Sequence, residues 1–113
     1  MKRFTWRDLE DRDAQTICSF VASAREAFHA FPKASWPLTS EQILHVAYGR
    51  DGCTVFLDLG QVAGYANFYE VSPGEFCTLG NLMVSPAHRR KGLARFVVQT
   101  MAHKAFGEFG ARE

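Results

Sequence analysis

The sequence predicts an α+β fold in which a mixed, mainly antiparallel sheet is flanked by helices. Apolar residues recur at helical spacing in the first third of the chain. Three β-branched and aromatic runs follow between residues 53 and 84, separated by short turns, and an amphipathic stretch comes after Gly92. The 113 residues, 47% of them hydrophobic, can bury a single core, so we expect one domain over residues 1–113.

The first third of the chain predicts a short strand and two helices. Residues 3–6 read as the strand, and an aspartate-rich connection follows. Residues 13–30 predict an amphipathic helix, because apolar side chains recur there at helical spacing: Ala14, Ile17, Cys18, Val21, Ala24 and Phe28. After a loop marked by two prolines, Thr39-x-x-Gln42 resembles a capping box that opens a second helix ending near Tyr48.

The middle of the chain predicts a three-stranded meander. Residues 53–59 and 62–71 form the first two strands, joined by Gly60-Gln61 as a two-residue turn of the Gly-X type. Residues 72–74 turn into a third strand over residues 76–84. Gly64 and Gly80 interrupt these strands, and each marks a bulge or a close backbone approach.

The last predicted element is a helix after Gly92. Its apolar face carries Leu93, Val97, Val98, Met101 and Ala105. This face should pack on the sheet.

Composition and charge argue against several classes of protein. The net charge of +1 gives no general attraction to nucleic acid or to an anionic membrane. Three cysteines without C-x-x-C spacing indicate neither a disulfide framework nor a zinc site, and the four scattered histidines form no metal motif. No apolar run resembles a signal peptide or a membrane span. We therefore expect a cytoplasmic protein without a metal.

The most informative segment runs from an apolar strand into a basic helix start. Leu82, Met83 and Val84 precede a proline, and Arg89, Arg90 and Lys91 precede Gly92. A helix start offers free backbone N–H groups to an anion, the basic residues add charge, and glycine lets a ligand approach closely. From the residues alone, a phosphate site and a solvated surface turn both explain this pattern.

Residues 84–94 resemble the central motif of the GNAT superfamily of N-acetyltransferases, V-x-P-x-x-[QR]-x-x-G-x-[GA]. The resemblance implies a three-layer fold that binds acetyl-CoA as acetyl donor. It implies that Leu82, Met83 and Val84 line the pantetheine arm and the thioester. The pyrophosphate would be held by Arg89, Arg90, Lys91, Gly92, Leu93 and Ala94.

The acceptor site and the proton-transfer groups are less defined by the sequence. The paired-helix region lies beside the acceptor site in the resembling family, so Phe28, Phe31 and Trp36 either shape that pocket or pack in the core. Tyr65, Asn67 and Tyr69 alternate on one face of their strand, where they contact substrate or a neighbouring strand. Glu70 and Glu75 are candidates for the general base, and both are equally ordinary charges beside a turn.

Two functions follow from these observations. One is an N-acetyltransferase that transfers acetyl to an amine of a small molecule or peptide by direct attack in a ternary complex. The other is a non-catalytic acyl-CoA-binding or interaction module. A nucleic-acid module is disfavoured because the basic cluster is short and lacks interleaved aromatic residues.

The sequence stops about where the next strand of the resembling family would begin. The predicted fold is therefore a C-terminally truncated version of that family's fold. Without a neighbouring strand, the edge formed by residues 76–84 would be open to another strand. This predicts either self-association, as in a homodimer, or that the sequence is part of a longer chain.

Overall fold

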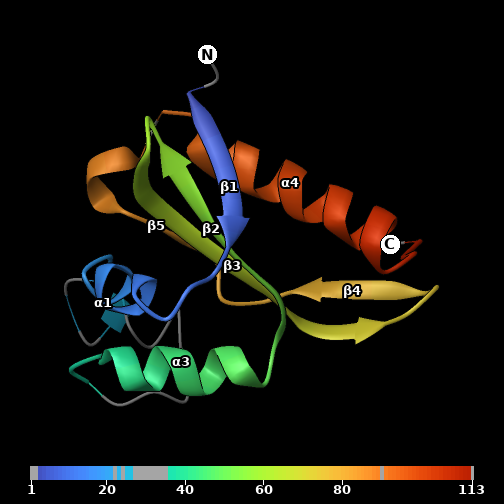
Figure 1. Cartoon of the computed structure of the whole chain (residues 1–113), viewed down its shortest axis with the longest axis horizontal. Coiled ribbons are helices and arrows are strands. Elements are labelled where there is room, and N and C mark those ends of the chain that lie inside the picture. Colours follow the sequence, from blue (N-terminus) through green and yellow to red (C-terminus); the bar gives the residue numbers. More distant parts are fainter. Residues whose placement is uncertain (1–2, 22, 24, 27–35, 90, 113) are drawn as a thin grey trace.

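A computed structural model describes residues 3–21, 23, 25–26, 36–89 and 91–112 (Figure 1). Its elements in chain order are β1 (Phe4–Asp8), α1 (Asp13–Cys18), α3 (Ser40–Tyr48), β2 (Asp51–Asp58), β3 (Gln61–Ser72), β4 (Phe76–Leu79), β5 (Met83–Val84), the 3₁₀ turn η1 (Pro86–His88) and α4 (Leu93–Glu108). None of the described helices is both long enough and apolar enough to span a membrane.

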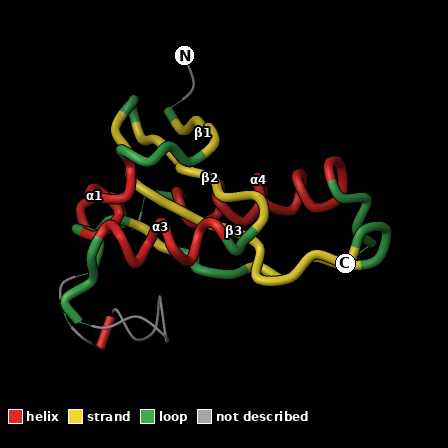
Figure 2. The backbone as a smooth tube through the Cα atoms, turned by 60° about the horizontal axis from the view of Figure 1, so that its bottom comes forward, coloured by secondary structure: helices red, strands yellow, loops and turns green. Residues whose placement is uncertain are grey.

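All strand pairs of the described residues are antiparallel, in agreement with the predicted mainly antiparallel sheet. Its strands lie in the order β1-β2-β3-β4, and β5 pairs with β3 on the same side as β4. The central strand β3 therefore pairs with β2 along one edge and with β4 and β5 along the other. Near the far end of the β3–β4 hairpin, the Gly74 N–H donates to the Phe109 carbonyl, which brings this turn beside the C-terminal end of α4 (Figure 2).

Helices cover both faces of the sheet, and each face has its own core. On one face, Val55 and Tyr65 pack with Ile17 of α1 and Ile43 of α3. On the other face, the core is formed by strand residues and one side of α4: Phe56, Ala63, Ala66, Phe68, Leu93, Val97, Met101 and Ala105. The alternation of side chains along a strand explains why neighbours such as Val55 and Phe56 enter different cores. This arrangement confirms the predicted α+β fold.

The predicted strand over residues 76–84 is divided in two by a bulge. Phe68 pairs with Leu79 and Tyr65 pairs with Met83, so two residues of β3 face the three residues 80–82 of the other strand. Gly80 sits at this point because a Cβ there would overlap Asn67 Oδ1 and lie 3.0 Å from the Tyr69 backbone nitrogen. A bulge bends its strand and re-aims the side chains beside it.

The predicted turn between β2 and β3 is wrong by one residue. The two turn residues are Leu59 and Gly60, with φ of 51° and 85°, rather than Gly60-Gln61. Positive φ at both positions is the pattern of a type I′ hairpin turn. The backbone N–H of Leu59 donates to the Arg3 carbonyl at 2.9 Å, which helps to hold this unusual leucine conformation.

The first helix also ends earlier than predicted. α1 stops at Cys18, and the Ser19 hydroxyl donates to the Thr16 carbonyl at 2.5 Å. The backbone N–H groups of Ser19 and Phe20 donate three residues back, which tightens the last turn and ends the helix. Of the predicted apolar stripe, Ala24 and Phe28 lie outside the described residues.

The other two helices largely follow their sequence signals. Thr39 caps α3 by accepting from the Gln42 backbone N–H, as the capping box predicts. On α4, Val98 is 48% exposed, so its predicted place in the core is wrong. The buried face instead includes Thr100 and Lys104. Lys104 is buried because its ammonium finds a hydrogen-bond acceptor in Thr54.

Candidate active site

The start of α4 is shaped for close approach by a ligand. Gly92 is the N-cap, with φ of 87°, and no side chain caps the helix there. The first N–H groups of a helix lack intrahelical acceptors, so this end can accept an anion. Leu93 is 1% exposed and anchors the helix start in the core, which leaves Lys91 and Ala94 at the surface.

The loop that leads to this helix is hydrogen-bonded to the sheet at both ends of η1. Ser85 continues the β5 pairing, because its N–H donates to the Ala63 carbonyl at 2.7 Å. At the other end, His88 Nδ1 lies 2.8 Å from Asp58 Oδ2 at the end of β2. Arg3 donates from Nε to Asp58 Oδ1 at 2.8 Å. Hydrogen bonds from Arg3, and then from His88, lower the pKa of Asp58 to about 2.

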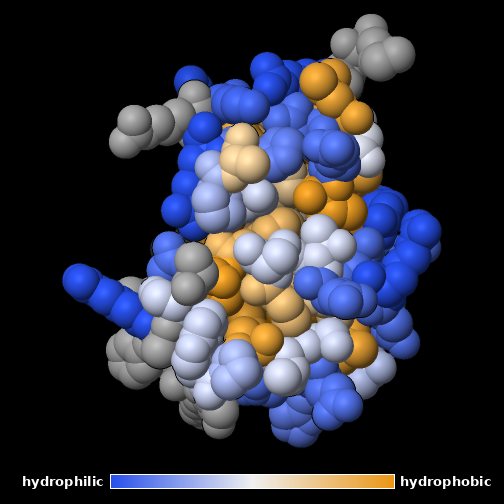
Figure 3. Space-filling model, turned by 90° about the vertical axis from the view of Figure 1, so that its left-hand side faces the viewer, coloured by the Kyte–Doolittle hydropathy of each residue, from blue (hydrophilic) through white to orange (hydrophobic). Residues whose placement is uncertain are grey.

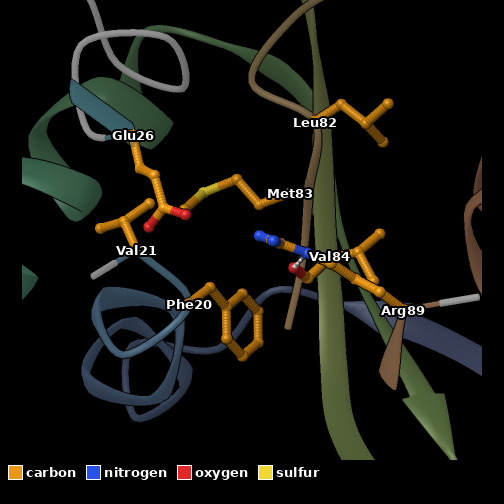
Figure 4. Close-up of a pocket in the computed structure, with 7 residues that line it drawn as sticks. All are labelled: Phe20, Val21, Glu26, Leu82, Met83, Val84 and Arg89. Carbon is orange, nitrogen blue, oxygen red and sulfur yellow. Dashed lines mark hydrogen bonds between the residues drawn. The ribbon is translucent and has the colours of Figure 1, made fainter. Parts of the chain in front are cut away.

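A pocket of about 260 Å³ lies between the segment after α1 and β5 (Figure 4). Its lining residues are Phe20, Val21, Glu26, Leu82, Met83, Val84 and Arg89. Figure 3 shows apolar side chains exposed across one face of the molecule and bordered by hydrophilic ones. The pocket therefore suits a ligand with an apolar body and a polar end.

Two charged side chains enter this apolar pocket. Arg89 donates from Nε to the Val84 carbonyl at 3.2 Å, which lays its guanidinium along β5 and into the pocket (Figure 4). Glu26 approaches from the opposite wall, beside Val21 and the Met83 side chain (Figure 4). The bulge explains the position of Leu82, which lines the pocket and is 39% exposed.

The structure brings together most of the residues predicted to bind the acetyl donor. Leu82, Met83 and Val84 line the pocket with Arg89. Lys91, Gly92, Leu93 and Ala94 form the adjoining helix start. Arg90 lies outside the described residues.

The residues predicted for the acceptor are more dispersed. Phe28 and Phe31 lie outside the described residues, and Trp36 is 47% exposed without lining the pocket. Tyr65 and Asn67 are fully buried, and the Asn67 amide donates to the Tyr65 hydroxyl at 2.8 Å. Burial raises the pKa of Tyr65.

Tyr69 and the two predicted base candidates also lie apart from the pocket lining. Tyr69 is exposed under the Arg50 guanidinium, 4.5 Å from its ring centroid. Glu70 lies opposite Thr78 in the β3–β4 pair. Glu75 lies in the turn of that hairpin, where its carbonyl accepts from the Arg112 N–H at 2.8 Å. Neither carboxylate lines the pocket.

Sequence reasoning missed three pocket residues and the anchor of the loop. The periodicity predicts one continuous helix through Phe20, Val21 and Glu26, whereas α1 ends at Cys18 and these three residues line the pocket. Asp58 and His88 are 30 positions apart, so no local pattern links them. The sequence signal that could have pointed to Asp58 is its place as a polar residue at the end of a predicted strand, beside a turn.

Comparison with known proteins identifies the family of this chain. Residues 13–113 match the model of the "Acetyltransferase (GNAT) family". The chain belongs to the GNAT family of acetyltransferases. Within the described residues, no group of three or more histidine, cysteine or acidic side chains could hold a metal ion.

Solved structures of GNAT proteins share the fold. A GCN5-related N-acetyltransferase from Kribbella flavida is 32% identical, with a TM-score of 0.64 over 95% of this chain and 67% of its own. A GNAT family acetyltransferase from Brucella melitensis, in complex with acetyl-CoA, is 22% identical, with a TM-score of 0.64 over 96% and 71%. A GNAT acetyltransferase from Bacillus anthracis is 17% identical, with a TM-score of 0.72 over 97% and 66%.

This GNAT chain thus spans about two thirds of the length of these relatives. No curated protein sequence matches it.

Proposed function

We propose that this chain binds acetyl-CoA along β5 and the start of α4 and transfers the acetyl group to an amine. The acceptor would be a small molecule or a peptide, and the amine would attack the thioester directly in a ternary complex. The observation that carries this proposal is the continuity of the site. An apolar pocket beside β5 leads through Arg89 to the glycine-capped start of α4.

The start of α4 suits the pyrophosphate of acetyl-CoA, and the apolar pocket suits its pantetheine arm and thioester. The first N–H groups of α4, Arg89 and Lys91 offer hydrogen bonds and positive charge to the pyrophosphate. By the family motif, Arg90, Leu93 and Ala94 join them, the last two through their backbone. Residues 82–84 line the apolar part of the pocket, where the pantetheine arm and the thioester would lie.

The transfer itself needs few special side chains. The amine nitrogen bonds to the carbonyl carbon, the carbon–sulfur bond breaks, and the sulfur leaves as a thiolate that takes up a proton from water. A backbone N–H of residues 82–84 that faces away from β3 would stabilise negative charge developing on the carbonyl oxygen. These groups are held by the sheet, so they need no reorganisation during the reaction.

We assign proton removal from the amine to Glu26. It is the carboxylate that lines the pocket among the residues that the structure describes, whereas Glu70 and Glu75 lie on the β3–β4 hairpin. A carboxylate at this wall can orient an incoming ammonium group and accept its proton directly or through a water.

Turnover tests this proposal. Release of free thiol from acetyl-CoA is measured over a panel of small amines and peptides with free N-termini. We expect amine-dependent release, which falls by roughly 100-fold or more in Glu26→Gln, the usual range for loss of a general base. Glu41→Gln, an exposed carboxylate on α3, is the matched control and keeps parent activity.

The same assay separates the alternative function. A parent chain that binds acetyl-CoA and releases no thiol with any amine is a non-catalytic acyl-CoA-binding module. Cytoplasmic location, and self-association through the β4–β5 edge, stay predictions of the sequence.

A further inference from the structure

The carboxylate of Asp58 joins three segments that are far apart in the sequence. It lies at the end of β2, and its side chain is 2% exposed. Oδ1 accepts from Arg3 Nε at 2.8 Å, and Oδ2 accepts from Arg3 Nη2 at 3.3 Å. Oδ2 also lies 2.8 Å from His88 Nδ1. An ionised carboxylate only accepts hydrogen bonds, so His88 carries its proton on Nδ1 and donates it here.

We propose that Asp58 positions the pyrophosphate-binding loop by holding His88. His88 ends η1, and it directly precedes Arg89 and lies four residues before Gly92. Its ring is only 16% exposed, so the imidazole is seated against the end of the sheet. This inference rests on the proposed function, because it assigns a role in acetyl-CoA binding to two residues that do not line the pocket.

Among the described residues of the loop, few backbone hydrogen bonds fix its position, so the side-chain bond of His88 serves as its anchor. After the Ser85 bond to the sheet, the described backbone bonds of the loop are local: His88 N–H to the Ser85 carbonyl at 2.9 Å, and Arg89 N–H to the Pro86 carbonyl at 3.5 Å. Both lie within the loop and do not fix its position relative to β2. The bond between His88 and Asp58 does.

A positioning role predicts a particular kinetic signature. Without this hydrogen bond, only a fraction of the molecules would have the loop in its binding position before acetyl-CoA arrives. The apparent affinity for acetyl-CoA falls in proportion to that fraction. The reacting groups lie on β5 and in the pocket and keep their arrangement. The KM for acetyl-CoA should therefore rise while kcat stays near the parent value.

The test compares His88→Ala with His88→Asn, because the asparagine amide can place an N–H near the position of Nδ1. Loop order is read without any ligand, from hydrogen exchange of a peptide covering residues 85–93, and kinetics are measured in parallel. We expect His88→Ala to exchange faster and to raise the KM for acetyl-CoA roughly tenfold, as for the loss of one charge-assisted hydrogen bond. His88→Asn should restore most of both losses.

Asp58→Asn provides a second variant, with Asp13→Asn as its matched control. Asp13 is also buried and is held by an arginine of β1, because Arg7 donates to its two oxygens at 2.7 and 2.9 Å. Both substitutions should lower the Tm, but only Asp58→Asn should speed exchange in the loop. The positioning role would be overturned by equal loop exchange rates in Asp58→Asn and Asp13→Asn. It would also be overturned if His88→Ala kept the parent exchange rate and the parent KM for acetyl-CoA.

The ligand-free measurement keeps the two proposals separate. A parent chain that fails to bind acetyl-CoA would refute the proposed function. Faster loop exchange in His88→Ala would still support the Asp58 anchor, and unchanged exchange would still refute it.

Discussion

The ammonium nitrogen of Lys104 lies 4.2 Å from the centroid of the Trp6 ring, although the lysine belongs to α4 and the tryptophan to β1. Lys104 is 5% exposed, and its Nζ donates to the Thr54 hydroxyl on β2 at 2.7 Å. The Lys104 side chain therefore joins helix α4 to the two strands β1 and β2. The cation–π contact and the hydrogen bond offset the cost of burying the charge.

Removal of the Lys104 side chain should lower the free energy of unfolding. Lys104→Ala deletes the hydrogen bond, the cation–π contact and the packed stem, so we expect it to lower the free energy of unfolding by about 2–3 kcal/mol. Lys104→Met keeps most of the stem and should cost about 1 kcal/mol. Urea denaturation measures both, with the exposed His103→Ala on α4 as control. Equal stability of Lys104→Ala and His103→Ala would show that the buried ammonium contributes nothing.

The bulge before β5 should depend on the absence of a side chain at position 80. In Gly80→Ala the new Cβ would overlap Asn67 Oδ1 and crowd the Tyr69 backbone, so we expect a loss of about 1–3 kcal/mol in unfolding free energy. Gly49→Ala is the control, because its Cβ would meet its nearest atom at 3.6 Å, an ordinary contact, and its φ is −96°. Thermal unfolding that ranks the two variants equally would contradict the placement of the bulge.

These two cases also show what the sequence can predict. Helix and strand periodicity predicts the layers well, because an apolar face must be buried wherever it occurs. Periodicity does not predict the burial of Lys104, because a lysine is normally expected at the surface. Its hydrogen-bond acceptor, Thr54, lies on β2 and is far away in the sequence. Likewise Gly80 signals an irregularity, but its position depends on how β4 and β5 each pair with β3.

The candidate site divides in the same way. The glycine-containing basic segment before α4 is local in sequence, so its motif predicts the donor site without the fold. The positions of Glu26 and Asp58 depend on features outside that motif: the early end of α1, and the approach of η1 to the end of β2. No spacing rule relates such residues to their partners.

Acid should destabilise the protein partly through Asp58. Its pKa falls from 3.8 to about 2 in the folded protein, because Arg3 and His88 donate hydrogen bonds to the ionised form. A lowered folded pKa gives stability that is present above pH 3.8 and is lost as the pH falls toward 2.

We therefore expect the Tm of Asp58→Asn to be lower than that of the parent at neutral pH and to fall less steeply between pH 3.8 and about 2. Thermal scans across this range test the expectation. Asp51→Asn, an exposed residue at the other end of β2, should keep the parent slope. A slope for Asp58→Asn identical to that of the parent would contradict the lowered pKa.

The basic side chains before Gly92 should contribute to acetyl-CoA affinity. Arg89→Ala and Lys91→Ala each remove one charge beside the helix start, and we expect each to weaken binding by ~1–2 kcal/mol, or roughly 5- to 30-fold. Calorimetry at low salt, where surface charges are least screened, measures the effect. Arg112→Ala is the control because this residue lies beside the β3–β4 turn. Parent affinity in both loop variants would identify Arg89 and Lys91 as solvated surface charges.

Calorimetric titration of acetyl-CoA into Gly92→Glu tests the central claim most directly. The substitution puts bulk and negative charge at the N-cap of α4, where the pyrophosphate is proposed to bind. Gly74→Glu is the matched control, because Gly74 has a similar φ, +80° against +87°, and lies in the β3–β4 turn with nothing within 4 Å of a new Cβ. With both variants shown to be folded by circular dichroism, we predict parent affinity for Gly74→Glu and no detectable binding for Gly92→Glu. Parent affinity in a folded Gly92→Glu would contradict the assignment of this helix start to acetyl-CoA.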